Sequence, residues 1–191
     1  NFAKAERHPP VLDHLAVCLA SQIRAEHLKV DVCCGLPLGG IALSRALAVF
    51  LGTEAIFLEK EVLELKTDVS RAKSKLVIGR HEVESGQRIL LVEDVCNNFS
   101  TTDQAVHCVQ EAGGILVGIA CFLNRSLTVD TVYNSSVGSL PVLALVRQPM
   151  MEYRQDDPEV AGDIAGGNVV WQPKSREGWQ KLHLLFWPRR A

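Results

Sequence analysis

The stretch that decides the fold is Leu90-Leu91-Val92-Glu93-Asp94-Val95-Cys96-Asn97-Asn98-Phe99-Ser100-Thr101-Thr102. It begins with an apolar run that is too short and too well bounded to span a membrane, so it predicts a buried strand. Two adjacent carboxylates follow, then a mostly polar loop that contains one Phe, then a helical pattern. The amides of such a loop and of a helix N-terminus can face an anion. Because the carboxylates can face hydroxyl groups or a metal-bound sugar, the stretch predicts a site for a polyhydroxylated phosphate.

The bulk composition is that of an ordinary soluble chain. It has 191 residues, 47% of them hydrophobic and 22% charged, with a formal net charge of -2. These values fit one domain with a sizeable core. There is no basic excess, so we expect no nucleic-acid partner. No apolar run reaches membrane-spanning length, so we expect no membrane association.

The start of the chain and its cysteines indicate the compartment. No signal-peptide pattern is visible at the start, and since Asn1 rather than Met opens the sequence we expect further residues upstream. The six cysteines form no C-x-x-C pair and lie mostly in apolar stretches. This pattern favours reduced thiols in a cytoplasmic protein.

Periodicity and turn residues predict alternating helices and strands along most of the chain. The expected helices cover about 11–27, 41–51 and 102–112, and the expected strands cover about 28–34, 55–58, 76–78, 89–93, 115–123 and 142–146. The charged segment 59–75 has no clean period and is interpreted as a mobile loop with a short helical piece. The tail from 147 shows little periodicity. The alternation predicts a parallel α/β sheet in one domain over 1–191, with a core of about 11–146 and an extension of about 147–191.

In such sheets the binding site lies beyond the carboxyl ends of the strands. This rule brings three segments to one edge of the sheet: the glycine-rich turn 35–40, the charged segment 59–61 and the loop 93–102. Each of them alone is a weak signal. Their order and spacing together predict one composite anion site.

In this order and spacing the segments resemble the type I phosphoribosyltransferase family. That family binds phosphoribosyl diphosphate (PRPP) with an apolar run, two acidic residues and a Thr/Gly/Ser loop, and the segment 89–101 resembles this motif. Further segments are similar to the orotate phosphoribosyltransferase branch. They are a pyrophosphate loop at 31–40, a Lys-Glu segment at 57–61, a hairpin before the PRPP strand at 77–88, a strand end with a base-binding Arg at 122–126 and, more weakly, an N-terminal substrate-facing segment at 1–9.

The resemblance covers about residues 1–130 and implies a fold and a reaction. The implied fold is a type I phosphoribosyltransferase-like parallel sheet flanked by helices, with a small hood from the terminal segments. The implied reaction is the Mg²⁺-dependent transfer of the 5-phosphoribosyl group from PRPP to orotate, a step of pyrimidine biosynthesis that gives orotidine 5'-monophosphate and pyrophosphate. The implied partners are PRPP, orotate or a similar base, and a second copy of the chain in a homodimer.

The resemblance also implies residue roles. Lys60, Glu93 and Asp94 would carry catalysis: the two carboxylates near the ribose hydroxyls, and the ammonium against the pyrophosphate charge. Arg125 would anchor a carboxylated base by a bidentate contact. Mg²⁺ would arrive mainly with PRPP, with Asp94 as the candidate for a direct contact, because Mg²⁺ prefers substrate phosphates plus a few carboxylates or waters. The implied PRPP-binding residues are Leu38, Gly39, Gly40, Lys60, Glu93, Asp94, Asn97, Asn98, Phe99, Ser100, Thr101 and Thr102.

Two departures from the family pattern keep other functions open. The family loop usually reads Thr-Thr-Gly-Gly-Ser, and here Phe99 and Ser100 stand in place of the glycines. Leu63 and Leu65 stand where many orotate enzymes have a Lys…His pair. The charge of that pair could come from Lys66, Arg71, Lys73 or Lys75. These departures favour, as an alternative, a PRPP-binding regulator without turnover, and a phosphoribosyltransferase for another base is a further alternative.

Overall fold

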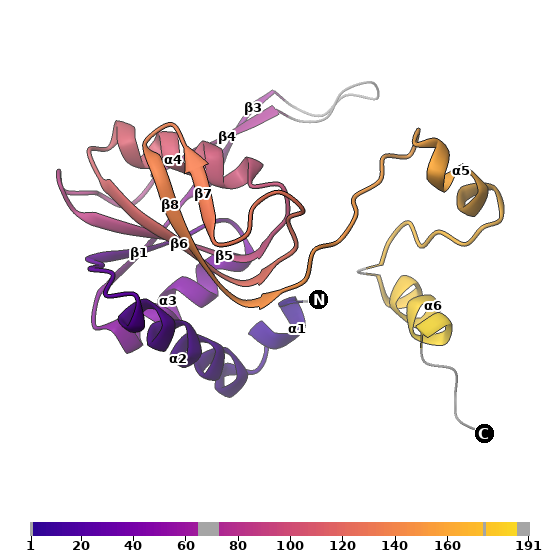
Figure 1. Ribbon diagram of the computed structural model, residues 1–191, viewed down its shortest axis with the longest axis horizontal. Coiled ribbons are helices and arrows are strands. Elements are labelled where there is room, and N and C mark those ends of the chain that lie inside the picture. Colours follow the sequence, from indigo (N-terminus) through magenta and orange to yellow (C-terminus); the bar gives the residue numbers. More distant parts are fainter. Residues whose placement is uncertain (1, 65–72, 174, 187–191) are drawn as a thin grey trace. The chain divides into compact units, whose positions relative to one another are not determined.

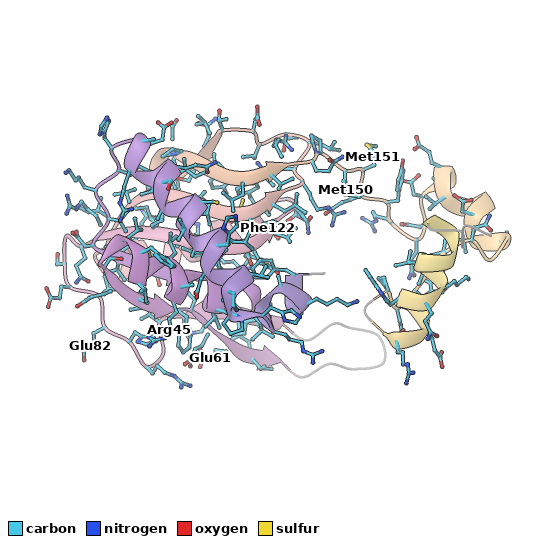
Figure 2. The ribbon with its side chains drawn as sticks, turned by 90° about the horizontal axis from the view of Figure 1, so that it is seen from below. Arg45, Glu61, Glu82, Phe122, Met150 and Met151 are labelled. Carbon is cyan, nitrogen blue, oxygen red and sulfur yellow. The ribbon has the colours of Figure 1, made fainter. Side chains whose placement is uncertain are left out.

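The computed structural model describes residues 2–64, 73–173 and 175–186, and it divides into two compact units. One unit is Phe2–Met150 and the other begins at Met151; Figure 2 labels these two methionines where the chain passes from one unit to the next. Each unit is described by itself. The expected single domain over 1–191, with an extension from about 147, stays a prediction.

A six-stranded sheet forms the centre of the first unit, in the order β2-β1-β5-β6-β8-β7. Its strands are β1 Val32–Gly35, β2 Glu54–Phe57, β5 Arg88–Cys96, β6 Ile115–Asn124, β7 Val132–Ser135 and β8 Gly138–Arg147. All neighbouring pairs are parallel except β7 and β8, which are antiparallel. The predicted parallel sheet is therefore confirmed, and the short edge strand β7 was not expected.

Helices cover both faces of this sheet, as Figure 1 shows. Helices α2 Pro9–Ala25 and α3 Gly39–Leu51 pack on one face, and α4 Ser100–Glu111 packs on the other. Strand β5 contributes side chains to the hydrophobic clusters on both faces of the sheet. Ile89 and Leu91 pack in the cluster with α4, and Leu90 and Val92 pack in the cluster with α2 and α3. A strand buried on both faces needs apolar residues at every position, which explains the continuous run in the sequence.

The N-terminal residues form a short helix, α1 Phe2–Glu6, that periodicity did not predict. Phe2 is buried, and its ring centroid lies 5.6 Å from that of Phe122 on β6. One aromatic residue therefore ties α1 to the body of the unit. At the N-terminal end, α1 is the described part of the hood that the terminal segments were expected to form. The contribution of the C-terminal segment to this hood stays a prediction.

The expected loop over 59–75 is wrong for the residues that the structure describes. Glu59–Glu64 is strand β3 and Lys73–Val77 is strand β4, and the two pair antiparallel in a separate sheet that projects from the unit (Figure 1). Lys75 and Glu61 lie opposite each other in register and form an ion pair of 2.9 Å. Charged cross-strand pairs stabilise a solvent-exposed ribbon. Because so many of its residues are charged, the segment lacks the apolar–polar alternation that would have predicted strands. Residues 65–72, with the candidates Lys66 and Arg71, lie outside the described residues.

The second unit contains two helices, α5 Pro158–Ala165 and α6 Arg176–Phe186, where the sequence indicated little periodicity. Helix α5 begins with a cap, because the side chain of Asp157 accepts a hydrogen bond from the Glu159 amide at 3.1 Å. An Asp before a Pro at the first helical position is a known start signal. Across the part of the chain that is described, no helix combines the length and apolar character needed to cross a bilayer.

Candidate active site

The acidic pair stands at the carboxyl end of β5, near the middle of the sheet. Glu93 is only 9% exposed, and burial, reinforced by Asp94, raises the pKa of its carboxyl to about 8, while the charge of Lys60 lowers it. The Asp94 carboxylate accepts a hydrogen bond from the Val95 amide at 2.9 Å. Lys60 lies on β3, so the hairpin places its ammonium within electrostatic reach of Glu93. The structure thus brings the three predicted catalytic residues to one place, and their roles stay predictions.

The turn between β1 and α3 presses directly against the end of β5. A Cβ atom on Gly40 would lie 2.1 Å from the Val92 carbonyl oxygen, and one on Gly39 would lie 2.2 Å from Cγ of Asp94. Neither position has room for a side chain without displacing its neighbour. Leu38, before them, is 85% exposed, and the peptide between Pro37 and Leu38 is cis. The predicted pyrophosphate turn is therefore in contact with the predicted ribose carboxylate.

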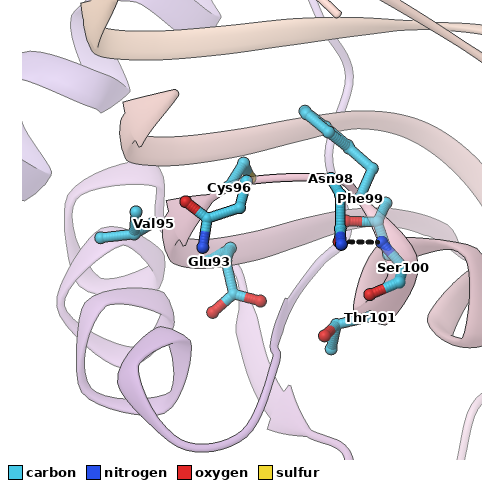
Figure 3. A pocket seen from close by; sticks show the side chains of 9 residues that line it. Glu93, Val95, Cys96, Asn98, Phe99, Ser100 and Thr101 are labelled. Atoms are coloured by element: carbon cyan, nitrogen blue, oxygen red, sulfur yellow. Dashed lines mark hydrogen bonds between the residues drawn. The ribbon is translucent and has the colours of Figure 1, made fainter. Parts of the chain in front are cut away.

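The predicted phosphate-binding loop, residues 97–102 (the phosphate loop), contains less loop than the sequence indicated, because α4 begins at Ser100 rather than at about 102. The Asn98 side chain accepts a hydrogen bond from the Ser100 amide at 3.1 Å (Figure 3). The first-turn amides of a helix have no partner within the helix, so those after Ser100 are available to an anion, whose charge the helix dipole also favours. The loop and the helix start surround a pocket of about 70 Å³ that is lined by Glu93, Val95, Cys96, Asn97, Asn98, Phe99, Ser100, Thr101 and Thr102.

The next strand end places Arg125 beside this loop. The Arg125 amide donates to the Cys96 carbonyl at 2.8 Å. Among the described residues, Nε of Arg125 and Oδ1 of Asn97 are buried and have no hydrogen-bond partner. A buried polar atom without a partner is costly, so both atoms are suited to a ligand that supplies the missing bonds.

Other residues join the site that the sequence did not single out. Glu6 on α1 is one, since burial and then the charge of Asp94 raise the pKa of its carboxyl. Glu59, which belongs to the predicted charged segment 59–61, forms an ion pair with Arg80 where the hairpin leaves the sheet. Tyr133 on β7 stacks on Phe99. Spacing gave no signal for Glu6 and Tyr133, because the elements α1 and β7 were not expected.

The thiols nearest the site are buried. Cys96 and Cys121 lie on adjacent strands, and their mutual hydrogen bond, followed by burial, raises the pKa of Cys96 well above its usual value. A thiol with a raised pKa is a poor nucleophile. Cys33 and Cys34 face opposite sides of β1.

Several solved structures with a similar fold are phosphoribosyltransferases. The chain is similar to adenine phosphoribosyltransferase of Trypanosoma brucei in complex with AMP, pyrophosphate and ribose-5-phosphate, with a TM-score of 0.59 and 15% identity over 88% of this chain and 81% of that one. It is also similar to purine phosphoribosyltransferase of Pyrococcus horikoshii, with a TM-score of 0.53 and 19% identity over 76% and 92%. The fold, with the acidic pair and the two loops at its carboxyl edge, is that of a type I phosphoribosyltransferase.

Sequence comparison identifies the branch, although no family model matches the chain. The chain is 31% identical over 183 residues to orotate phosphoribosyltransferase of Sulfurimonas denitrificans, covering 91% of this chain and 83% of that protein. It is 34% identical over 124 residues to the enzyme of the same name from Wolinella succinogenes, and there the match spans 64% of this chain and about half, 55%, of the relative. The chain belongs to the orotate phosphoribosyltransferase family.

Proposed function

We propose that this chain transfers the 5-phosphoribosyl group of PRPP to orotate, giving orotidine 5'-monophosphate and pyrophosphate. The observation that carries the proposal is the contact between the Gly39–Gly40 turn and the end of β5, with the phosphate pocket on the adjoining side of the same strand end. This arrangement provides neighbouring places for a pyrophosphate, a ribose and a 5-phosphate. Family membership supports the choice of reaction.

Each proposed role in the reaction follows from the chemistry of the residue that has it. Displacement of pyrophosphate passes through an oxocarbenium-like state, so the enzyme must fix the ribose and stabilise the charge that develops on the leaving group. Glu93 and Asp94 accept hydrogen bonds from the ribose hydroxyls, and the amides at the start of α4 hold the 5-phosphate. Lys60 and the backbone of the 38–40 turn face the pyrophosphate. Arg125 holds the carboxylate of the base.

Mg²⁺ belongs to the same proposal. The carboxylate of Asp94 is a hard oxygen donor, and Mg²⁺ combines one or two such groups with substrate phosphates and water. Mg²⁺ would neutralise pyrophosphate charge as that group leaves. Among the described residues there is no cluster of three or more His, Cys, Asp or Glu side chains that could hold a metal ion, and the proposed ion arrives with PRPP.

Assembly and location complete the proposal. We place the chain in the cytoplasm, where its six free thiols would stay reduced.

We expect a homodimer in which the β3–β4 hairpin meets the partner subunit, since Val62 and Leu63 at the end of β3 are more than half exposed. Light scattering behind gel filtration would give twice the chain mass. A Val62→Ser, Leu63→Ser double variant should shift the protein toward the monomer.

The experiment that tests the reaction mixes the protein with PRPP, Mg²⁺ and orotate. Loss of orotate absorbance and release of pyrophosphate should proceed in equal amounts, and omission of PRPP should abolish both. Binding of PRPP by calorimetry without turnover would instead support a regulator that retains the fold, which the altered residues of the phosphate loop favour. Faster turnover with adenine or uracil than with orotate would support the alternative of another base.

A further inference from the structure

Phe99 has an unusual backbone conformation for its residue type. It is the residue before α4, and its φ of 59° and ψ of 13° lie in the left-handed region. Residues with a Cβ atom are disfavoured there, which is why glycine usually fills such positions. The chain therefore keeps a left-handed backbone in its phosphate loop while it gives up the glycine, and some other interaction must hold that conformation.

The aromatic ring of Phe99 supplies this interaction. The side chain is 4% exposed, and its ring stacks on Tyr133 with centroids 5.0 Å apart and planes 17° from parallel. Figure 3 shows the ring pointing away from the Glu93 carboxylate and from the hydroxyls of Ser100 and Thr101. Burial of a phenyl ring and aromatic stacking are both stabilising. The ring thus holds the loop from behind, and the pocket in front stays polar.

Tyr133 is fixed independently of Phe99. It lies on β7 opposite Leu140 of β8, and its hydroxyl donates to Oδ1 of Asp103 at 3.3 Å. The segment before β7 is held as well, because the Asn124 side chain donates to the carbonyls of Val129 and Asp130, both at 3.0 Å. One tyrosine therefore contacts the phosphate loop on both sides of the helix start, at Phe99 and, four residues later, at Asp103.

We propose that Phe99 and Tyr133 are positioning residues for PRPP: their stack holds the backbone of residues 97–102 in the conformation that presents its amides to the 5-phosphate. This inference rests on the proposed function. A loop already fixed in its bound conformation loses less entropy when the ligand binds, so the stack acts on affinity. The pair would then do by packing what glycines do by conformational freedom in the usual loop. Its effect should fall on PRPP and leave the base site nearly unchanged.

Three variants test the proposal, with the Kd of PRPP measured by calorimetry in the presence of Mg²⁺ and the KM of orotate measured by turnover. Phe99→Gly accepts the same φ without strain but removes the ring, and Tyr133→Leu removes the partner ring from another element. Each should weaken PRPP binding about tenfold, or about 1.4 kcal/mol, with the KM of orotate within about twofold. Tyr133→Phe keeps the stack and should recover the wild-type Kd within about twofold.

The outcomes separate this inference from the proposed function. Wild-type PRPP affinity in a folded Phe99→Gly or Tyr133→Leu variant would overturn the inference while leaving the reaction intact. Equal losses for PRPP and orotate would also overturn it, since they indicate general damage to the fold. If the wild type binds PRPP without consuming orotate, the reaction fails and the same Kd comparison still decides the inference. Should Phe99→Gly not fold, Tyr133→Leu decides it, and absence of PRPP binding by the wild type would overturn both.

Discussion

The two halves of the site at the end of β5 are built in different ways. The acidic half, formed by Asp94 and the Gly39–Gly40 turn, is fixed by close contacts in which one added Cβ atom would meet a neighbour near 2 Å. The phosphate half, residues 97–102, presents main-chain amides at a helix start, and its Phe99 ring stacks on Tyr133. The first half resembles the family pattern in its residue types, and the second half departs from it at Phe99 and Ser100.

This difference shows what each kind of function requires. A carboxylate that must meet hydroxyl groups needs its own side chain, so Asp94 has no substitute among neutral residues of similar size. An amide that must meet a phosphate needs only a backbone conformation, and different side chains can hold that conformation. We therefore expect substitutions in the acidic half to have larger effects on PRPP than those in the phosphate half.

The largest effect should come from Asp94→Asn. The change keeps the size of the side chain but removes the charge that strengthens hydrogen bonds to the ribose, and bonds to charged groups contribute more than neutral ones. We expect turnover or PRPP affinity to fall at least about 100-fold, or about 2.7 kcal/mol, while circular dichroism stays unchanged. Glu26→Gln, an exposed carboxyl after α2 that precedes the amino end of β1, is the matched control and should behave as wild type. Full activity of Asp94→Asn would remove the acidic pair from the mechanism.

Alanine substitutions of the two glycines in the turn should affect different quantities, the free energy of unfolding for one and the PRPP affinity for the other. In Gly40→Ala the new Cβ meets the Val92 carbonyl, which is backbone and cannot move aside, so we expect a loss of about 1–3 kcal/mol in the free energy of unfolding. In Gly39→Ala the new Cβ meets the movable Asp94 carboxylate. That variant should stay close to the wild type in stability and lose about tenfold in PRPP affinity. Urea unfolding and calorimetry would check the pair, and identical behaviour of the two variants would contradict the contacts.

The buried carboxyl of Glu93 should make stability depend on pH in the ligand-free protein. Because burial raises its pKa from 4.5 to about 8, the folded state holds this proton over a range in which the unfolded chain has lost it. The stabilising contribution is complete below about pH 4.5 and is lost as the pH rises toward 8, by up to about 1.4 kcal/mol for each pH unit. Urea midpoints between pH 5 and 8 should therefore fall less in Glu93→Gln than in the wild type. Parallel curves for the two proteins would show that Glu93 titrates normally.

The smallest effect should come from Asn98→Ala in the phosphate half. It removes the side chain that accepts a hydrogen bond from the Ser100 amide at 3.1 Å. For comparable helix starts, such a removal lowers the free energy of unfolding by about 0.5–2 kcal/mol. Since the freed amide can still face the phosphate and Phe99 still holds the loop, PRPP affinity should fall less than about threefold. A loss as large as that of Asp94→Asn would mean that the two halves do not differ as described.

The sequence predicted most of the central sheet because burial leaves a clear pattern there. Strand β5 shows a continuous apolar run, and α2 and α3 show helical spacing. The strands β3 and β7 and the helix α1 were missed, and only the end of β4 was predicted. These elements are short, exposed or charged, and their stability comes from partners far along the chain. Cross-strand pairs such as Lys75 with Glu61 are invisible until the register is known.

The candidate site could be predicted where one residue type carries the chemistry. Glu93, Asp94 and the two glycines stand out in the sequence, and the rule for strand ends brought their segments together. Tyr133 and Glu6 could not be predicted, since nothing local relates them to the loop at 97–102 or to Asp94. Glu93 was expected as a ribose ligand, but its raised pKa depends on burial that only the fold shows.

The most direct test of this account is a calorimetric titration of the full chain with PRPP in the presence of Mg²⁺, repeated with Asp94→Asn and with excess pyrophosphate. We predict one PRPP site for each wild-type chain, competition by pyrophosphate, and loss of measurable binding in the variant. PRPP binding that neither Asp94→Asn nor pyrophosphate changes would contradict the placement of the site at the end of β5.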